Sequence, residues 1–157
     1  MWRFVTAVLA TLMTILVVAP AQSAELTADA AHTLVARDVW SKDPLPKPEE
    51  LAAARKVLEA QAAREPQAER WTFALGRVAS IEAERASGDA AKTKRKEALK
   101  GFERAVELAP GNADYQYWFA SASIERVDDV GMLSKMSLAS DGRKALENAI
   151  AIDPIMV

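Results

Sequence analysis

Apolar residues recur at helical spacing in three segments that each end in proline. These segments run from Leu51 to Pro66, from Ala98 to Pro110 and from Gly142 to Pro154. A bulky apolar residue lies eight positions before each proline, at Leu58, Phe102 and Leu146, and alanine lies five positions before two of them, at Ala105 and Ala149. These offsets fall on one helical face. Because proline cannot continue a helix, the pattern predicts three helices that stop at these prolines.

The three prolines are spaced by 44 residues, and a further helix is predicted after each of the first two, at 69–84 and 113–126. Leu75-Gly76 lies nine and ten positions after Pro66, and Phe119-Ala120 lies at the same distance after Pro110. A large residue beside a very small one lets a facing helix approach closely. The pattern therefore predicts repeated helix pairs with Leu75 and Phe102 in their core. One more helix is predicted at 27–40, with Thr27 as its N-cap.

These residues resemble the tetratricopeptide repeat family, and the best match is Leu75-Gly76, Ala98, Phe102, Ala105 and Pro110. The unit that follows is a weaker copy, with Gly142 where a small Ala is usual. The resemblance implies an all-α fold: a short right-handed superhelix of antiparallel helix pairs. The pairs would occupy residues 25–66, 67–110 and 111–157, after a separate segment at 1–24.

The repeat is about ten residues longer than the family's usual length of about 34. The additional residues are expected between the two helices of a pair, near 85–95 and 127–140, as longer helices, a loop or a short helix. Gly88-Asp89 predicts a break, with Asp89 as a helix cap. The basic cluster Lys92, Lys94, Arg95 and Lys96 favours a solvated tip over an anion-binding patch. Met132, Leu133 and Met136 favour a short packed helix over an adaptable recognition surface.

The first 24 residues have the features of a signal peptide. Arg3 precedes a mainly apolar run at 5–19, and small residues suitable for cleavage follow at 19–24. The alternative is a retained anchor, although about 20 apolar residues are needed to span a bilayer. The sequence therefore predicts an exported protein without a stable membrane span after cleavage. The mass of the exported protein would distinguish cleavage from retention.

Composition removes several classes of function. The chain has no cysteine, so disulfides and thiolate chemistry are excluded, and its net charge of −2 does not favour nucleic acid as a partner. No segment resembles a phosphate loop, a nucleophile elbow or a zinc-protease motif. His32 is expected to be a solvated helix residue. Three acid pairs are expected to be solvated or helix-start charges: Glu49-Glu50, Glu82 with Glu84, and Asp128-Asp129. We therefore expect no catalytic residue, cofactor or metal, and an enzyme is disfavoured.

What the resemblance implies for function is a scaffold that binds a protein or peptide in its concave groove, in the periplasm or outside the cell. First helices line that groove, which places six residues in it: Arg70, Phe73, Arg77, Asp114, Tyr117 and Ser121. The last helix is expected to present Ile150 and Ile152 to solvent, because no further helix follows it. An exposed apolar surface of this kind indicates either a missing segment or docking on a partner, including a homo-oligomer through the C-terminal helix. A signal-anchored scaffold or a subunit of an envelope complex is the alternative.

Overall fold

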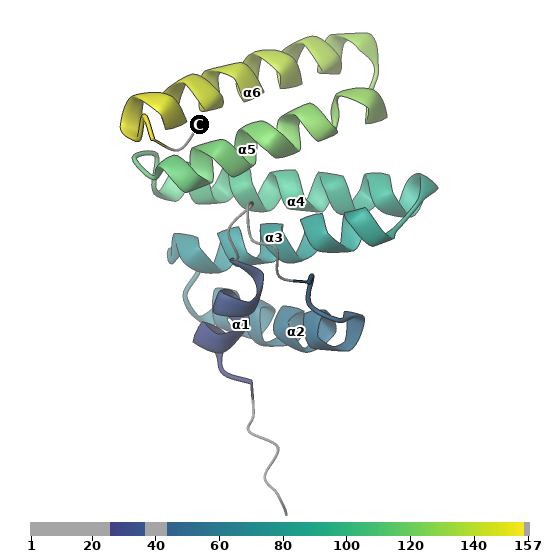
Figure 1. The fold of residues 1–157 in the computed structure, drawn as a ribbon, viewed down its shortest axis with the longest axis vertical. Helices are drawn as coiled ribbons and strands as arrows, with labels where there is room; N and C mark the ends of the chain where they lie inside the picture. The colour runs from purple at the N-terminus through teal and green to yellow at the C-terminus, as the bar shows by residue number, and fades with distance from the viewer. Residues whose placement is uncertain (1–25, 37–43, 156–157) are drawn as a thin grey trace, which may run out of the picture.

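The computed structural model describes residues 26–36 and 44–155, and all regular structure in these ranges is helical. The helices are α1 (Ala28–Val35), α2 (Pro48–Arg64), α3 (Glu69–Arg85), α4 (Gly88–Leu108), α5 (Ala113–Glu125) and α6 (Met132–Ile152), with a 3₁₀ turn η1 (Val127–Asp129) before α6. Figure 1 shows α2 to α6 stacked in chain order, with α1 beside α2 and α3. The all-α prediction is confirmed. The predicted signal peptide and the end of the predicted helix at 27–40 lie outside the described residues.

The helix ends follow the predicted signals. α2, α4 and α6 each end two residues before proline, ahead of Pro66, Pro110 and Pro154. Thr27 caps α1 as predicted, since its Oγ1 accepts a hydrogen bond from the Ala30 N–H at 3.2 Å. The periodic prolines therefore mark where the second helix of each predicted pair ends.

Glycine brings α3 and α4 into direct contact. A Cβ at Gly76 would lie 2.8 Å from the Phe102 ring, and a Cβ at Gly101 would lie 2.8 Å from the Gly76 Cα and 2.9 Å from the Thr72 carbonyl oxygen. The two backbones can touch only because both positions lack a side chain. The close approach predicted at Leu75-Gly76 is confirmed. Phe102 is fully buried as predicted, whereas Leu75 is only half-buried.

The contact between α5 and α6 repeats this arrangement 44 residues further along the chain. A Cβ at Gly142 would lie 3.1 Å from the Ser123 Cβ and 3.3 Å from the Ala120 carbonyl oxygen. Ala120 and Gly142 stand one repeat after Gly76 and Ala98. Gly142 thus lies at a close contact between these two helices.

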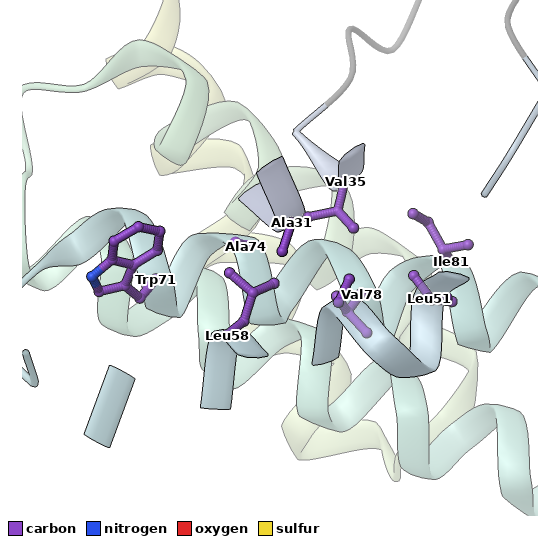
Figure 2. Close-up of a cluster of buried hydrophobic side chains, with 9 residues drawn as sticks. Ala31, Val35, Leu51, Leu58, Trp71, Ala74, Val78 and Ile81 are labelled. Carbon is purple, nitrogen blue, oxygen red and sulfur yellow. The ribbon is translucent and has the colours of Figure 1, made fainter. Parts of the chain in front are cut away.

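Two apolar clusters hold the helices together. The first joins α1, α2 and α3, and Figure 2 shows Val35, Leu51, Leu58, Trp71 and Val78 among its buried side chains. The second joins α3, α4 and α5 through aromatic rings, with centroids 4.7 Å apart for Phe73 and Tyr115, 5.6 Å for Phe73 and Phe102, and 5.9 Å for Phe102 and Trp118. Such tilted and stacked pairs add to the area that the rings bury. No described helix is both long and apolar enough to cross a membrane.

The additional residues lengthen the second helix in the α3–α4 and α5–α6 pairs. α4 and α6 both have 21 residues, and only residues 86 and 87 separate α3 from α4. Gly88 has a φ of 58°, which explains the predicted break. The prediction that Asp89 caps a helix is wrong, because α4 already begins at Gly88. Asp89 instead lies in the first turn of α4 and pairs with Lys92 at 3.1 Å.

The apolar tip is not the short packed helix that was expected. Met132, Leu133 and Met136 form the first turns of α6, and their exposed fractions are 74%, 85% and 67%. The residues are helical, but none of the described residues covers these side chains. The alternative, an adaptable recognition surface, stays a prediction.

Candidate functional site

The six predicted binding residues divide into a surface group and a buried group. Asp114 is exposed, Tyr117 and Ser121 are half-buried, and the Arg70 side chain is 50% exposed. Phe73 and Arg77 are each only 6% exposed. The strip along α3 that the sequence suggested is therefore not an open surface.

Phe73 is buried because two neighbouring helices contribute rings to it. Its ring lies against Tyr115 of α5 and Phe102 of α4. A ring enclosed in this way stabilises the array and offers no area to a partner. The sequence prediction that Phe73 contacts a ligand is corrected accordingly.

Arg77 is also a structural residue, joining α1, α3 and α5. Its Cζ lies 3.4 Å from the centroid of the Trp118 ring, and its Nε donates a hydrogen bond to the Val35 carbonyl oxygen at 3.2 Å. That carbonyl is at the C-terminal end of α1, where a helix attracts positive charge. Burial lowers the pKa of Arg77 to about 10, despite the opposing effect of the carboxylates of Glu84 and Glu125. Arg77 is thus a charged cross-link between helices.

The accessible residues on the outward side of α5 form what we call the α5 strip: Asp114, Tyr117 and Ser121. Their spacing of three and four residues places them on one helical face. The Tyr117 ring meets the Trp118 ring edge to face at 5.8 Å, and the Ser121 Oγ donates to Glu125 Oε1 at 3.3 Å. Trp118 in turn is stacked on buried Phe102, so the strip rests on the core.

Arg70 belongs to the edge of α3 near α1. Its Cζ lies 4.0 Å from the Trp71 ring centroid, and its Nη1 is 3.4 Å from Asp29 Oδ1. His32 of α1 meets the same Trp71 edge to face at 6.2 Å. Burial lowers the pKa of His32, and the charge of Arg70 lowers it further. His32 is therefore half-buried against an aromatic ring, which corrects the expectation of a solvated side chain.

An ion network that sequence reasoning missed joins α2, α3 and α4. Arg55 Nη2 lies 2.6 Å from Glu82 Oε2, Lys94 Nζ lies 2.7 Å from the same oxygen, and Arg55 also pairs with Glu97. The partners are far apart in sequence, so no short motif could have revealed them. Of the predicted basic cluster, Lys94 is thus engaged within the chain, and so is Arg95.

Arg95 makes two hydrogen bonds to Asp129 of η1, both at 2.6 Å. This fork geometry fits a carboxylate closely and fixes η1 against α4. The cluster is therefore not a fully solvated tip. Lys94 and Arg95 join neighbouring elements, whereas Lys92 and Lys96 are exposed.

The network predicts a loss of stability in acid. Burial alone would raise the pKa of Glu82, but hydrogen bonds from Arg55 and Lys94 hold it below its ordinary value, and Arg95 likewise lowers the pKa of Asp129. A carboxyl with a depressed pKa stabilises the fold above its unfolded-state pKa, and this contribution disappears as the pH falls through the folded-state pKa. We expect Glu82→Gln to lower the free energy of unfolding by about 2 kcal/mol at pH 7 and to make that free energy decline less steeply in acid.

Urea unfolding at pH 7, 5 and 3 measures both effects. Glu84→Gln, at an exposed position two residues further along α3, serves as the matched control and should behave like the wild type. If the free energy of unfolding fell equally with pH in Glu82→Gln and the wild type, the network would not stabilise the fold.

Nowhere in 26–36 or 44–155 do three or more His, Asp or Glu side chains gather in a way that could hold a metal ion. The acid pairs have structural surroundings: Glu50 accepts a hydrogen bond from the Lys47 N–H at 2.7 Å at the start of α2, and Asp128 is 3.5 Å from Lys135. The surface instead presents aromatic, polar and apolar side chains along the helices.

No known protein family, curated protein or solved structure matches this chain.

Proposed function

We propose that the protein is an exported, non-catalytic scaffold that binds a protein or peptide segment along the α5 strip. The observation that carries the proposal is the shared outward face of Asp114, Tyr117 and Ser121 on a helix anchored to the core through Trp118. A rigid helix that presents an aromatic ring between polar groups suits recognition of an extended or helical partner. The buried residues Phe73 and Arg77 support this helix from below.

A tetratricopeptide-like arrangement is part of the same proposal. Its support is the 44-residue equivalence between the α3–α4 and α5–α6 contacts, in which small residues at corresponding positions bring the helices together. In such an array successive first helices lie side by side, which would extend the strip from α5 toward the Arg70 edge of α3. The Tyr117 ring would supply contact area, and Asp114 and Ser121 would hydrogen-bond to polar groups of the partner.

Export rests on the residues before the described part of the chain. The charge at Arg3, the apolar run and the small residues at 19–24 are the features that a signal peptidase substrate requires. The intact mass of the exported protein should correspond to a chain that begins between residues 22 and 25. A mass that includes Met1 would instead support the anchored alternative.

Site-specific photocrosslinking tests the binding proposal. The photoreactive residue benzoylphenylalanine replaces Tyr117 in one variant and Lys100, an exposed residue of α4, in a control. We expect irradiation of the exported fraction to give a discrete adduct from position 117 and none from position 100. No adduct from either position, or the same adduct from both, would contradict recognition through the α5 strip.

A further inference from the structure

The outer face of α6 corresponds to a face of α4 that another helix covers. Leu99, Phe102 and Val106 of α4 pack in the cluster that includes Tyr115 and Phe119 of α5. The residues one repeat later are Arg143, Leu146 and Ile150 of α6. Ile150 is 41% exposed, and α6 is the outermost described helix of the stack in Figure 1. Two of the three equivalent positions, Leu146 and Ile150, are apolar as on α4, whereas Arg143 stands where α4 has Leu99.

The face continues toward the start of α6. Steps of three or four residues connect its members, which keeps them on one side of the helix. We call this set the α6 stripe: Met132, Met136, Ala139, Arg143, Leu146 and Ile150. Met132 and Met136 are among the most exposed apolar side chains in the described part of the chain. A stripe of this length would bury substantial apolar area against a helix of similar length.

The stripe is symmetric about residue 141. Met132 and Ile150 lie nine residues to either side of it, Met136 and Leu146 lie five, and Ala139 and Arg143 lie two. When two such helices cross antiparallel at this point, each position meets its symmetry mate on the other helix. Bulky apolar residues then face bulky apolar residues, and each Arg143 faces the small Ala139.

We propose that the α6 stripe is a dimer interface, in which α6 of a second copy packs antiparallel on α6. The second copy takes the place that α5 takes on α4, so the interface continues the stacking already present within the chain. A two-fold interface uses the same patch on both subunits, which the symmetric register provides. A parallel pairing would instead place Arg143 against Arg143. In the antiparallel pairing Arg143 keeps its charge at the rim, where Glu147 lies 3.1 Å away.

Cysteine crosslinking tests this geometry directly, because the chain contains no cysteine of its own. Purified Met132→Cys and Ile150→Cys variants are oxidised separately and then as a mixture. We expect a disulfide-linked dimer from the mixture only, since two copies of position 132 would be about 27 Å apart along the antiparallel helices. A covalent dimer of Met132→Cys alone would indicate parallel pairing and overturn the proposal.

Light scattering over a range of concentrations provides the second measurement. We expect the wild type to dimerise and Met132→Asp to weaken dimerisation about thirtyfold or more, because it buries an unpaired charge at the interface. Ser134→Asp adds the same charge to an exposed position of α6 outside the stripe and should leave the dimer unchanged. A wild type that stays monomeric at high concentration, or equal effects of the two variants, would overturn the proposal.

Discussion

Phe102→Ala should lower the free energy of unfolding by about 3–5 kcal/mol, which is a large part of the stability of a chain this size. The Phe102 side chain is fully buried, and its ring lies against the backbone at Gly76 and beside the rings of Phe73 and Trp118. Removing it leaves a cavity where α3, α4 and α5 meet. Urea denaturation followed by circular dichroism measures the loss.

Leu133→Ala is the matched control for this experiment. Leu133 is 85% exposed, so truncating it should change the stability by no more than about 0.5 kcal/mol. If Phe102→Ala melted at the wild-type temperature, the packing of the α3–α4 pair described above would be wrong.

Gly101→Ala should cost about 2–3 kcal/mol although alanine favours helices over glycine by about 1 kcal/mol. The new Cβ would meet the backbone atoms of Gly76 and Thr72 within 3 Å, and backbone atoms cannot rotate away. α3 and α4 would have to separate. Gly76→Ala should also destabilise the pair, because its Cβ would meet the buried Phe102 ring at 2.8 Å and the Ala98 carbonyl oxygen at 3.2 Å.

Gly111→Ala is the control for the glycine substitutions. Nothing lies within 4 Å of a Cβ at Gly111, and the φ of Gly111 is not in the left-handed region. The stability of Gly111→Ala should therefore equal or slightly exceed that of the wild type. Equal stability of Gly101→Ala and Gly111→Ala in thermal unfolding would show that the two helix backbones are not in contact.

The helices and their closest contacts could be predicted because their signals are local. Proline blocks the helix within its own turn, and a small residue beside a large one, as at Leu75-Gly76, favours the close approach of a facing helix. Gly101 carried the same information, but a lone glycine in a helical pattern has many explanations. Its role follows only from the position of Gly76 across the pair.

The candidate site could be predicted only in part because exposure depends on neighbours. The spacing placed Arg77 and Ser121 at equivalent positions of successive helices, yet Trp118 and the end of α1 enclose Arg77. The ion network could not be predicted for the same reason. Arg55 and Glu82 lie on different helices, and the sequence alone does not give the relative orientation of those helices. Helical spacing likewise identified the face of Met132 and Met136 but not whether another segment covers it.

The most direct test of partner recognition by the α5 strip is the affinity of the Tyr117→Ala variant for the protein crosslinked at position 117. Tyr117 is half-buried at the surface, so the variant should fold normally. Isothermal titration calorimetry should show binding at least about tenfold weaker than the wild type, since aromatic rings dominate such interfaces. Lys100→Ala should bind like the wild type. Unchanged affinity of folded Tyr117→Ala would contradict the account.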